Sequence, residues 1–197
     1  MTYRSLLYFP IVHTQADLGG LGEQVRRLKV SRLGTSGWKR TVKQIDQWWT
    51  GIEDAIARLP LCYERVRVYQ DGLPDCSREL EIVAELAQAG SRNHRLLLGL
   101  QQKGAALMGT ESPELLLEEY RLATTALRAG RARQAVRDSL LVQRDRYIAG
   151  RINNTLLGGE TGILFLGLLH AVAPLLAPDI RVVYPLGLPQ PAGGPAR

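Results

Sequence analysis

The 197-residue sequence has little cysteine and histidine and no long, unbroken apolar run. Its two cysteines, Cys62 and Cys76, make no disulfide framework, and the absence of a CxxC or Cys/His cluster argues against a structural zinc site. The longest apolar run, residues 162–176, is interrupted by His170 and Pro174 and is shorter than the roughly 20 residues of a membrane-spanning helix. We therefore expect a protein of the reducing cytoplasm without a membrane segment.

Several common sequence signals are also absent. The N-terminal stretch MTYRSLLYFPIVHTQ has few apolar residues before polar ones return and no small-residue cleavage site, so we expect no export signal. No P-loop, GxGxxG motif or internal repeat occurs. The glycine-rich residues 17–22 lack the lysine-serine pair of a P-loop, and we interpret them as a flexible loop or a helix start.

Basic residues outnumber acidic ones and give a formal net charge of +6, which suits an anionic partner. The excess gathers in two clusters, one with Arg26, Arg27, Lys29 and Arg32, the other with Arg128, Arg131, Arg133 and Arg137. Neither cluster has interleaved aromatic residues or a nucleic-acid-binding motif. We interpret both as solvated basic faces and regard nucleic acid as the less favoured partner.

Short apolar segments alternate with longer segments of helical period. The strand candidates are residues 6–12, 65–69, 105–109, 162–169 and 180–184, and the helix candidates are residues 41–59, 77–89, 112–127 and 133–157. This alternation implies parallel strands joined by crossover helices. The sequence therefore predicts the α/β class: a single domain, residues 1–185, with a mostly parallel central sheet and crossover helices on both faces. A Pro/Gly-rich flexible tail, residues 186–197, is expected to follow it.

Four predicted strands are followed by a histidine or a carboxylate, at the point where a helix is about to start. These residues are His13, Asp71, Glu111 and His170. In open α/β sheets the carboxyl ends of the strands form the edge where ligands bind. The alternative for the acidic residues, Asp17 included, is a favourable negative charge near a helix N-terminus, which contributes about 0.3–1 kcal/mol each.

Histidine occurs three times, and two of the three histidines lie at these strand ends. His13 and His170 together with carboxylates provide either a divalent-metal site or a general acid/base pair. A structural, hydrogen-bonded histidine is the alternative for each. His94 begins a helix-like run and is left outside the candidate site.

The helix candidate at residues 133–157 carries a charged pair on its inward side. Val136, Leu140, Ile148, Ile152 and Leu156 form an apolar row in which Arg144 fills the missing place. Asp145 lies beside Arg144, and a charged pair facing a core is costly unless it has partners. Either the two residues form a structural ion pair, or Arg144 reaches the strand-end site and holds a carboxylate, a carbonyl or an oxyanion.

Residues 144–184, RDRYIAGRINNTLLGGETGILFLGLLHAVAPLLAPDIRVVY, resemble the closing segment of the TraB/TIKI-like superfamily, which is related to erythromycin-esterase-like and ChaN-like proteins. Members typically have a helix with an arginine and a polar neighbour, a glycine-containing turn, and a hydrophobic strand that ends in GxxH. Residues 167–170, Gly-Leu-Leu-His, match GxxH. Residues 10–13 would be the N-terminal counterpart, with Pro10 in place of glycine, and Glu111 would be the intervening acid. The chain resembles a small, divergent member.

The resemblance implies a site of two histidines, an acid and an arginine that serves hydrolytic chemistry, in some members with a divalent metal, while some relatives bind haem-like ligands. Our first hypothesis is a hydrolase in which His13 and His170 bind Mn, Co, Zn or Fe or act as acid and base. In it Glu111 activates water or completes the metal shell, Asp71 supports a histidine or the metal, and Arg144 stabilises developing negative charge.

Asp145 is assigned to ligand binding together with Asp71, and the substrate is a small molecule or a peptide. The second hypothesis is a ligand-binding or assembly protein that uses the same fold without turnover, and a homo-oligomer is compatible with both. Trp48 and Trp49 continue the apolar face of the helix candidate at residues 41–59, so we interpret them as core residues, with a protein interface as the alternative.

Overall fold

The computed structural model describes residues 3–14, 17, 22–124 and 131–187. Its strands are β1 (Arg4–Ile11), β2 (Val66–Gln70), β3 (Ala106–Met108), β4 (Thr161–Gly167) and β5 (Ile180–Val183). Its helices are α1 (Gly22–Ala57), α2 (Glu79–Gln88), α3 (Arg92–Gln102), α4 (Pro113–Thr124) and α5 (Arg131–Thr155), with short 3-10 helices η2 (Tyr63–Arg65) and η3 (Ala173–Leu175).

The five strands form one sheet in the order β3-β2-β4-β1-β5, and every neighbouring pair is parallel. The predicted α/β class with a parallel central sheet is therefore confirmed, and all five strand candidates overlap an observed strand. β1 starts earlier than predicted because Arg4 pairs with Ile180 of β5 and Ser5 with Thr161 of β4. β1 has a neighbouring strand on each side, but its pairing with β5 ends at Leu7. Pro10, which has no N–H to donate, lies beyond that pairing and is therefore tolerated.

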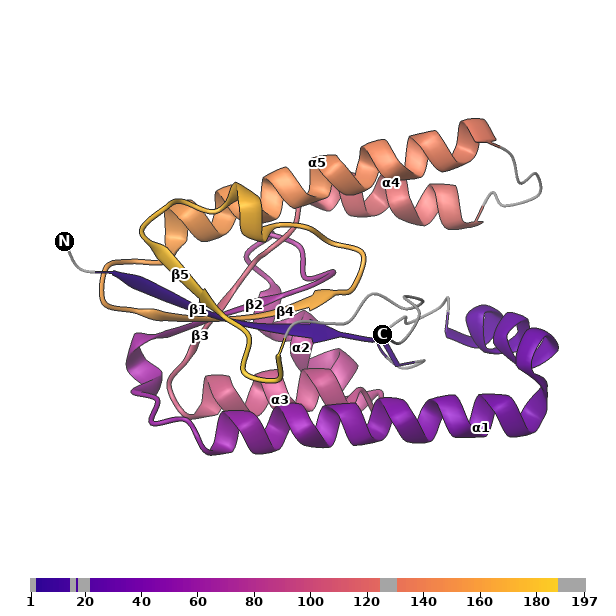
Figure 1. The fold of residues 1–197 in the computed structure, drawn as a ribbon, viewed down its shortest axis with the longest axis horizontal. Coiled ribbons are helices and arrows are strands. Elements are labelled where there is room, and N and C mark those ends of the chain that lie inside the picture. The colour runs from indigo at the N-terminus through magenta and orange to yellow at the C-terminus, as the bar shows by residue number, and fades with distance from the viewer. Residues whose placement is uncertain (1–2, 15–16, 18–21, 125–130, 188–197) are drawn as a thin grey trace, which may run out of the picture.

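Helices cover both faces of the sheet: α1, α2 and α3 lie on one face and α4 and α5 on the other (Figure 1). Side chains alternate along each strand, so Phe9, Val68 and Phe165 enter the core under α1 and α3. Tyr8 and Leu164 enter the second core, under α5. Because both faces are covered, the strands are almost continuously apolar, as β4 illustrates.

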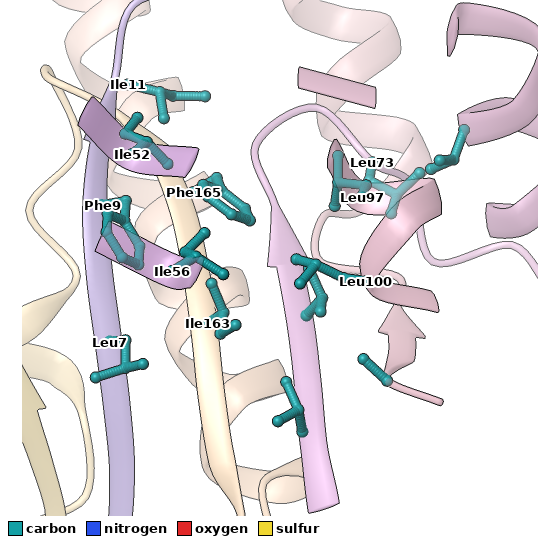
Figure 2. Packing of buried hydrophobic residues seen from close by; sticks show 14 of the residues in the cluster. Leu7, Phe9, Ile11, Ile52, Ile56, Leu73, Leu97, Leu100, Ile163 and Phe165 are labelled. Carbon is teal, nitrogen blue, oxygen red and sulfur yellow. The ribbon is translucent and has the colours of Figure 1, made fainter. Parts of the chain in front are cut away.

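The larger core lies between β1, β4 and β2 on one side and α1 and α3 on the other (Figure 2). Trp49 is fully buried there, and Trp48 packs against the same cluster, which confirms their interpretation as core residues. Both indole N–H groups also donate to the end of β1, Trp48 to the Pro10 carbonyl at 2.8 Å and Trp49 to the Val12 carbonyl at 3.4 Å. These bonds hold the strand end from which His13 emerges.

Two helices differ from the prediction. α1 begins at Gly22 rather than near residue 41, because residues 26–44 are mostly exposed and therefore have no apolar face to recognise in the sequence. Gly34, with φ 69° and ψ 167°, divides α1 into two helical parts. α3 was not among the helix candidates and corresponds only to the helix-like run that His94 begins; it is short and buries only Leu97 and Leu100 as apolar residues.

The basic clusters are described only in part. Arg26 and Arg27 are paired with Glu23 on the surface of α1. Arg137 is exposed on α5, whereas Arg128 lies outside the described residues. Of the predicted tail, residues 186–197, the structure describes only the first two residues, and Leu186 packs against the larger core.

Cys62 and Cys76 are both exposed and are not joined to each other. No helix in the described part of the chain combines the length and apolar character needed to cross a membrane.

Candidate functional site

All six predicted site residues meet at the carboxyl edge of the sheet. Asp71 directly follows β2, and His13 and His170 follow β1 and β4 within three residues. Glu111 follows β3, where it forms an isolated parallel bridge with Pro74. The other two residues, Arg144 and Asp145, come from the middle of α5, and neither bonds to the other.

Arg144 lies at the centre of the buried charges. Its Nε and Nη2 atoms each donate to one oxygen of Glu111 at 2.6 Å. Nη2 also donates to Asp71 Oδ1 at 3.0 Å, and Nη1 donates to Oε2 of the half-exposed Glu119 at 2.6 Å. Arg144 is 5% exposed and Glu111 is 0% exposed, so the pair is removed from bulk water. Arg144 therefore reaches the strand-end site and holds three carboxylates.

Asp71 joins the two histidines. Its Oδ2 atom accepts from His13 Nε2 at 3.0 Å and from the backbone N–H of Gly167 at 2.8 Å. Its Oδ1 atom lies 3.7 Å from His170 Nε2. A Cβ atom at position 167 would lie 2.8 Å from Asp71 Oδ2, so the carboxylate occupies space that only glycine leaves open.

His170 is held by Asp145. The carboxylate accepts from His170 Nδ1 at 2.6 Å through one oxygen and from the backbone N–H of Ala171 at 2.9 Å through the other. Because a carboxylate only accepts, Nδ1 carries the proton, and Nε2 is left facing Asp71 Oδ1 beyond hydrogen-bond distance. Nε2 is therefore the nitrogen that is free to exchange a proton or bind a cation.

The protonation states follow from burial and from these contacts. Burial opposes the ionised form of Asp71, but the hydrogen bond from His13 and the charges of His13, His170 and Arg144 outweigh it and hold the pKa of Asp71 well below 3.8. Burial also opposes protonation of His13, yet the bond to Asp71 and its charge raise the pKa of His13 above 6.5. Burial raises the pKa of Glu111, and the Arg144 guanidinium acts against this effect.

Asp71, Glu111 and His170 each offer one ligand atom, and these atoms lie within 4.8 Å of one another. Two carboxylates and an imidazole fit a divalent metal, and His170 has the supporting carboxylate that metal-binding histidines usually have. Arg144 now uses both Glu111 oxygens, so a metal that takes Glu111 as a ligand must displace the guanidinium. This set differs in one member from the predicted metal ligands, His13, Glu111 and His170, because Asp71 takes the place of His13. His13 instead donates to Oδ2 of Asp71.

A second buried polar cluster, not predicted from the sequence, lies on the other side of His13. Ser91 caps α3 and bonds to Asp17 and, at 2.7 Å, to His94 Nδ1. Burial opposes the ionised form of Asp17, but its bonds to His94, Ser91 and Thr14 lower its pKa. The charge of Asp17 in turn raises the pKa of His13. The sequence signals for this cluster are capping signals and not site motifs: Ser91 before a helix-like run, and Asp17 three residues after Thr14.

Comparisons of the chain with protein-family models, with curated proteins and with solved structures give no match in any of the three. The function is therefore argued from the geometry of the residues at the carboxyl edge of the sheet.

Proposed function

We propose that the chain is a hydrolase that activates water at His170, within a site formed by His170, Asp145, Asp71, Glu111 and Arg144. The observation that carries this proposal is the orientation of His170. Asp145 accepts the Nδ1 proton across 2.6 Å, and Nε2 lies 3.7 Å from Asp71 Oδ1, which is a spacing that a water molecule or a cation can bridge.

Each residue has a distinct task in this proposal. His170 Nε2 takes a proton from water, and Asp145 stabilises the imidazolium that results. Asp71, held ionised by His13 and Arg144, orients the same water through Oδ1. Arg144 keeps Glu111 and Asp71 in place, and it offsets their negative charge in a buried site.

A divalent metal, Mn, Co, Zn or Fe, belongs to this proposal, with Asp71, Glu111 and His170 as the residues that would hold it. Such an ion would lower the pKa of a bound water toward neutrality. The charge balance supports a cation, because Asp71, Glu111 and Glu119 share the single guanidinium of Arg144, and Asp145 adds a fourth carboxylate at His170.

We also infer a distant relationship with the TraB/TIKI-like superfamily. The support is that His170, Glu111 and Arg144, which resemble positions of its pattern, lie in one cluster although they are far apart in sequence. A cytoplasmic location is part of the same proposal, since both cysteines are exposed and unpaired.

Elemental analysis of the purified protein tests the metal directly. The variants Asp71→Asn, Glu111→Gln and His170→Ala are compared with wild type and with Asp54→Asn, an exposed carboxylate on α1. We expect near-stoichiometric Mn, Co, Zn or Fe in wild type and in the control, and its loss in the three site variants. Metal retained by all three variants, or no metal after incubation with these ions, would remove the metal from the proposal. A screen of ester and peptide substrates with His170→Ala then tests the remaining His170–Asp145 chemistry.

One observation favours a second candidate, a ligand-binding protein without turnover. Arg144 and Glu111 satisfy each other in a buried, bidentate ion pair, and such a pair is compatible with a rigid structural role. A wild-type protein that binds a ligand at His170 but hydrolyses neither esters nor peptides would support this candidate.

A further inference from the structure

A cavity of about 330 Å³ opens beside His170, and neither Asp71 nor Glu111 is among its lining residues. Tyr8 and Pro10 of β1 and Tyr184, which follows β5, line one side of it. The segment that follows β4, residues 168–174, lines the other. His170 thus belongs both to the lining of the cavity and to the ion-paired cluster, so a group in the cavity would lie next to the proposed reaction centre.

The lining is uncharged except for His170. None of the described residues that line the cavity is an aspartate, glutamate, lysine or arginine. Tyr8 and Tyr184 stack with ring centroids 5.1 Å apart and present aromatic surface. Burial raises the pKa of both tyrosines, so their hydroxyl groups stay neutral. A charged ligand group would lose its hydration here without gaining a counter-charge.

We propose that this cavity binds an uncharged apolar group of the substrate, an aromatic ring or a short aliphatic chain, and so places an adjoining ester or amide bond at His170. The inference rests on the proposed function for the reaction, but the binding step stands on the cavity alone. The volume is sufficient, since cavities of about 150 Å³ already hold a benzene ring. Asp145 and Asp71 behind His170 would repel an anionic group.

Binding is tested first, with three probes of nearly equal size: benzyl alcohol, benzylamine and benzoate. Each is titrated into the full-length protein while the ring C–H signals of His170 are followed by NMR. We expect benzyl alcohol to shift these signals and to bind at least about tenfold more tightly than benzoate, which loses its hydration in the cavity and is repelled by Asp71 and Asp145. Benzylamine, whose cation these carboxylates attract, shows how much of any binding is electrostatic. Equal or tighter binding of benzoate than of benzyl alcohol would overturn the proposal.

A variant pair tests the location. Ala173→Phe fills the cavity, and Ala89→Phe adds the same ring at an exposed position after α2, in the opposite helix layer. We expect Ala173→Phe to weaken benzyl alcohol binding by about tenfold or more and Ala89→Phe to leave it unchanged. Unchanged binding to a folded Ala173→Phe would contradict the proposal. If this variant does not fold, the ranking of benzyl alcohol against benzoate on wild type still decides.

Hydrolysis separates this inference from the proposed function. Methyl phenylacetate should have a lower KM than methyl acetate in wild type, and Ala173→Phe should remove that preference. Binding of benzyl alcohol at His170 without hydrolysis of either ester would reject the proposed function and leave the cavity's role intact. Hydrolysis without a preference between the two esters would reject the role of the cavity alone.

Discussion

Arg144 shows why a charge can lie inside this protein. Its guanidinium replaces the water that Glu111 and Asp71 lose on burial, and it does so with charge-assisted bonds of 2.6–3.0 Å. Burial opposes the charge on Arg144, but the bonds and charges of Glu111 and Asp71 outweigh this and raise its pKa. Each partner therefore depends on the other, and removing one leaves an uncompensated charge.

Arg144→Met should destabilise the protein by about 3–5 kcal/mol, because it leaves Asp71 and Glu111 buried without their cation. The measurement is urea unfolding at pH 7. Arg146→Met, at an exposed position on the same helix, is the matched control and should change the free energy of unfolding by less than about 0.5 kcal/mol. Equal stability of the two variants would show that the Arg144 network contributes little.

The His13–Asp71 pair makes stability depend on pH. A histidine whose folded pKa is raised above 6.5 contributes stability that is complete below that value and is lost as pH rises through the folded pKa. An aspartate whose pKa lies below 3.8 contributes stability that is present above 3.8 and is lost as pH falls through the folded pKa. The pair therefore stabilises the fold fully between pH 3.8 and pH 6.5.

Asp71→Asn should bring the pKa of His13 below its wild-type value, because the hydrogen bond to a charged partner is lost while burial remains. An NMR titration of the histidine ring signals measures this directly. Asp138→Asn, at an exposed position on α5, serves as the control and should leave the His13 titration unchanged. A His13 pKa that is the same in both variants would contradict the assignment of Asp71 as its partner.

At the residue scale the sequence indicates which side chains meet, but not how they pair. Polar residues after four strands predicted His13, Asp71, Glu111 and His170, because parallel strands bring their carboxyl ends to one edge. The gap in an apolar row predicted Arg144. Glu119 carries no such signal, since an acidic residue on a half-exposed helix face is ordinary. Sequence spacing does not show which way a side chain points. It therefore could not indicate that Asp71, and not His13, lies beside Glu111 and His170.

At the scale of elements, the end of β4 organises the site. The strand is apolar because both faces are covered, and it ends at Gly167, whose N–H bonds to Asp71. Three residues later the chain reaches His170, whose own N–H donates to the Gly167 carbonyl at 3.1 Å. A glycine and a tight turn thus place two site residues on the same carboxylate, which the GxxH spacing alone does not reveal.

Gly167→Ala should displace the Asp71 carboxylate, because the added Cβ would lie 2.8 Å from Oδ2. We expect a loss of about 1–3 kcal/mol in the free energy of unfolding, as for other insertions into close-packed sites, and a lower pKa of His13. Gly150→Ala on α5 is the matched control; its Cβ would meet nothing within 4 Å, and it should stabilise the helix by about 0.5–1 kcal/mol. A Gly167→Ala protein as stable as wild type, with an unchanged His13 titration, would show that the close approach is not needed.

Element prediction succeeded where packing leaves a periodic pattern and failed where it does not. The five strands were predictable as short apolar runs, and α5 was predictable from buried positions that recur at the helix period. The first half of α1 makes little contact with the core, and α3 buries polar residues such as Asn93 and His94 together with its leucines. The first part of α1 therefore lacks the apolar stripe that marks a helix in a sequence. In α3 the buried Leu97 and Leu100 do have helical spacing, but buried polar residues lie beside them.

At the scale of the whole molecule, both helix layers extend past the edge that holds the site. The α4–α5 pair does so on one face of the sheet and the N-terminal half of α1 on the other (Figure 1). Among the described residues of α1, Ile45 is the first that packs against the larger core. Leu28 and Leu33 are more than 45% exposed on the part before it. The parts of these helices that extend past the sheet therefore lie on both sides of the candidate site.

Hydrogen exchange along α1 should divide this helix into two parts. Residues 35–44 lack core contacts, so their amides should open locally at low free energy and exchange at least about a hundredfold faster than those of residues 48–57. The second half carries Trp49, Ile52 and Ile56 into the core and provides an internal control within the same helix. Mass spectrometry of peptides from both halves makes the comparison. Equal protection of the two halves would contradict the expectation that the described core alone determines which amides of α1 are protected.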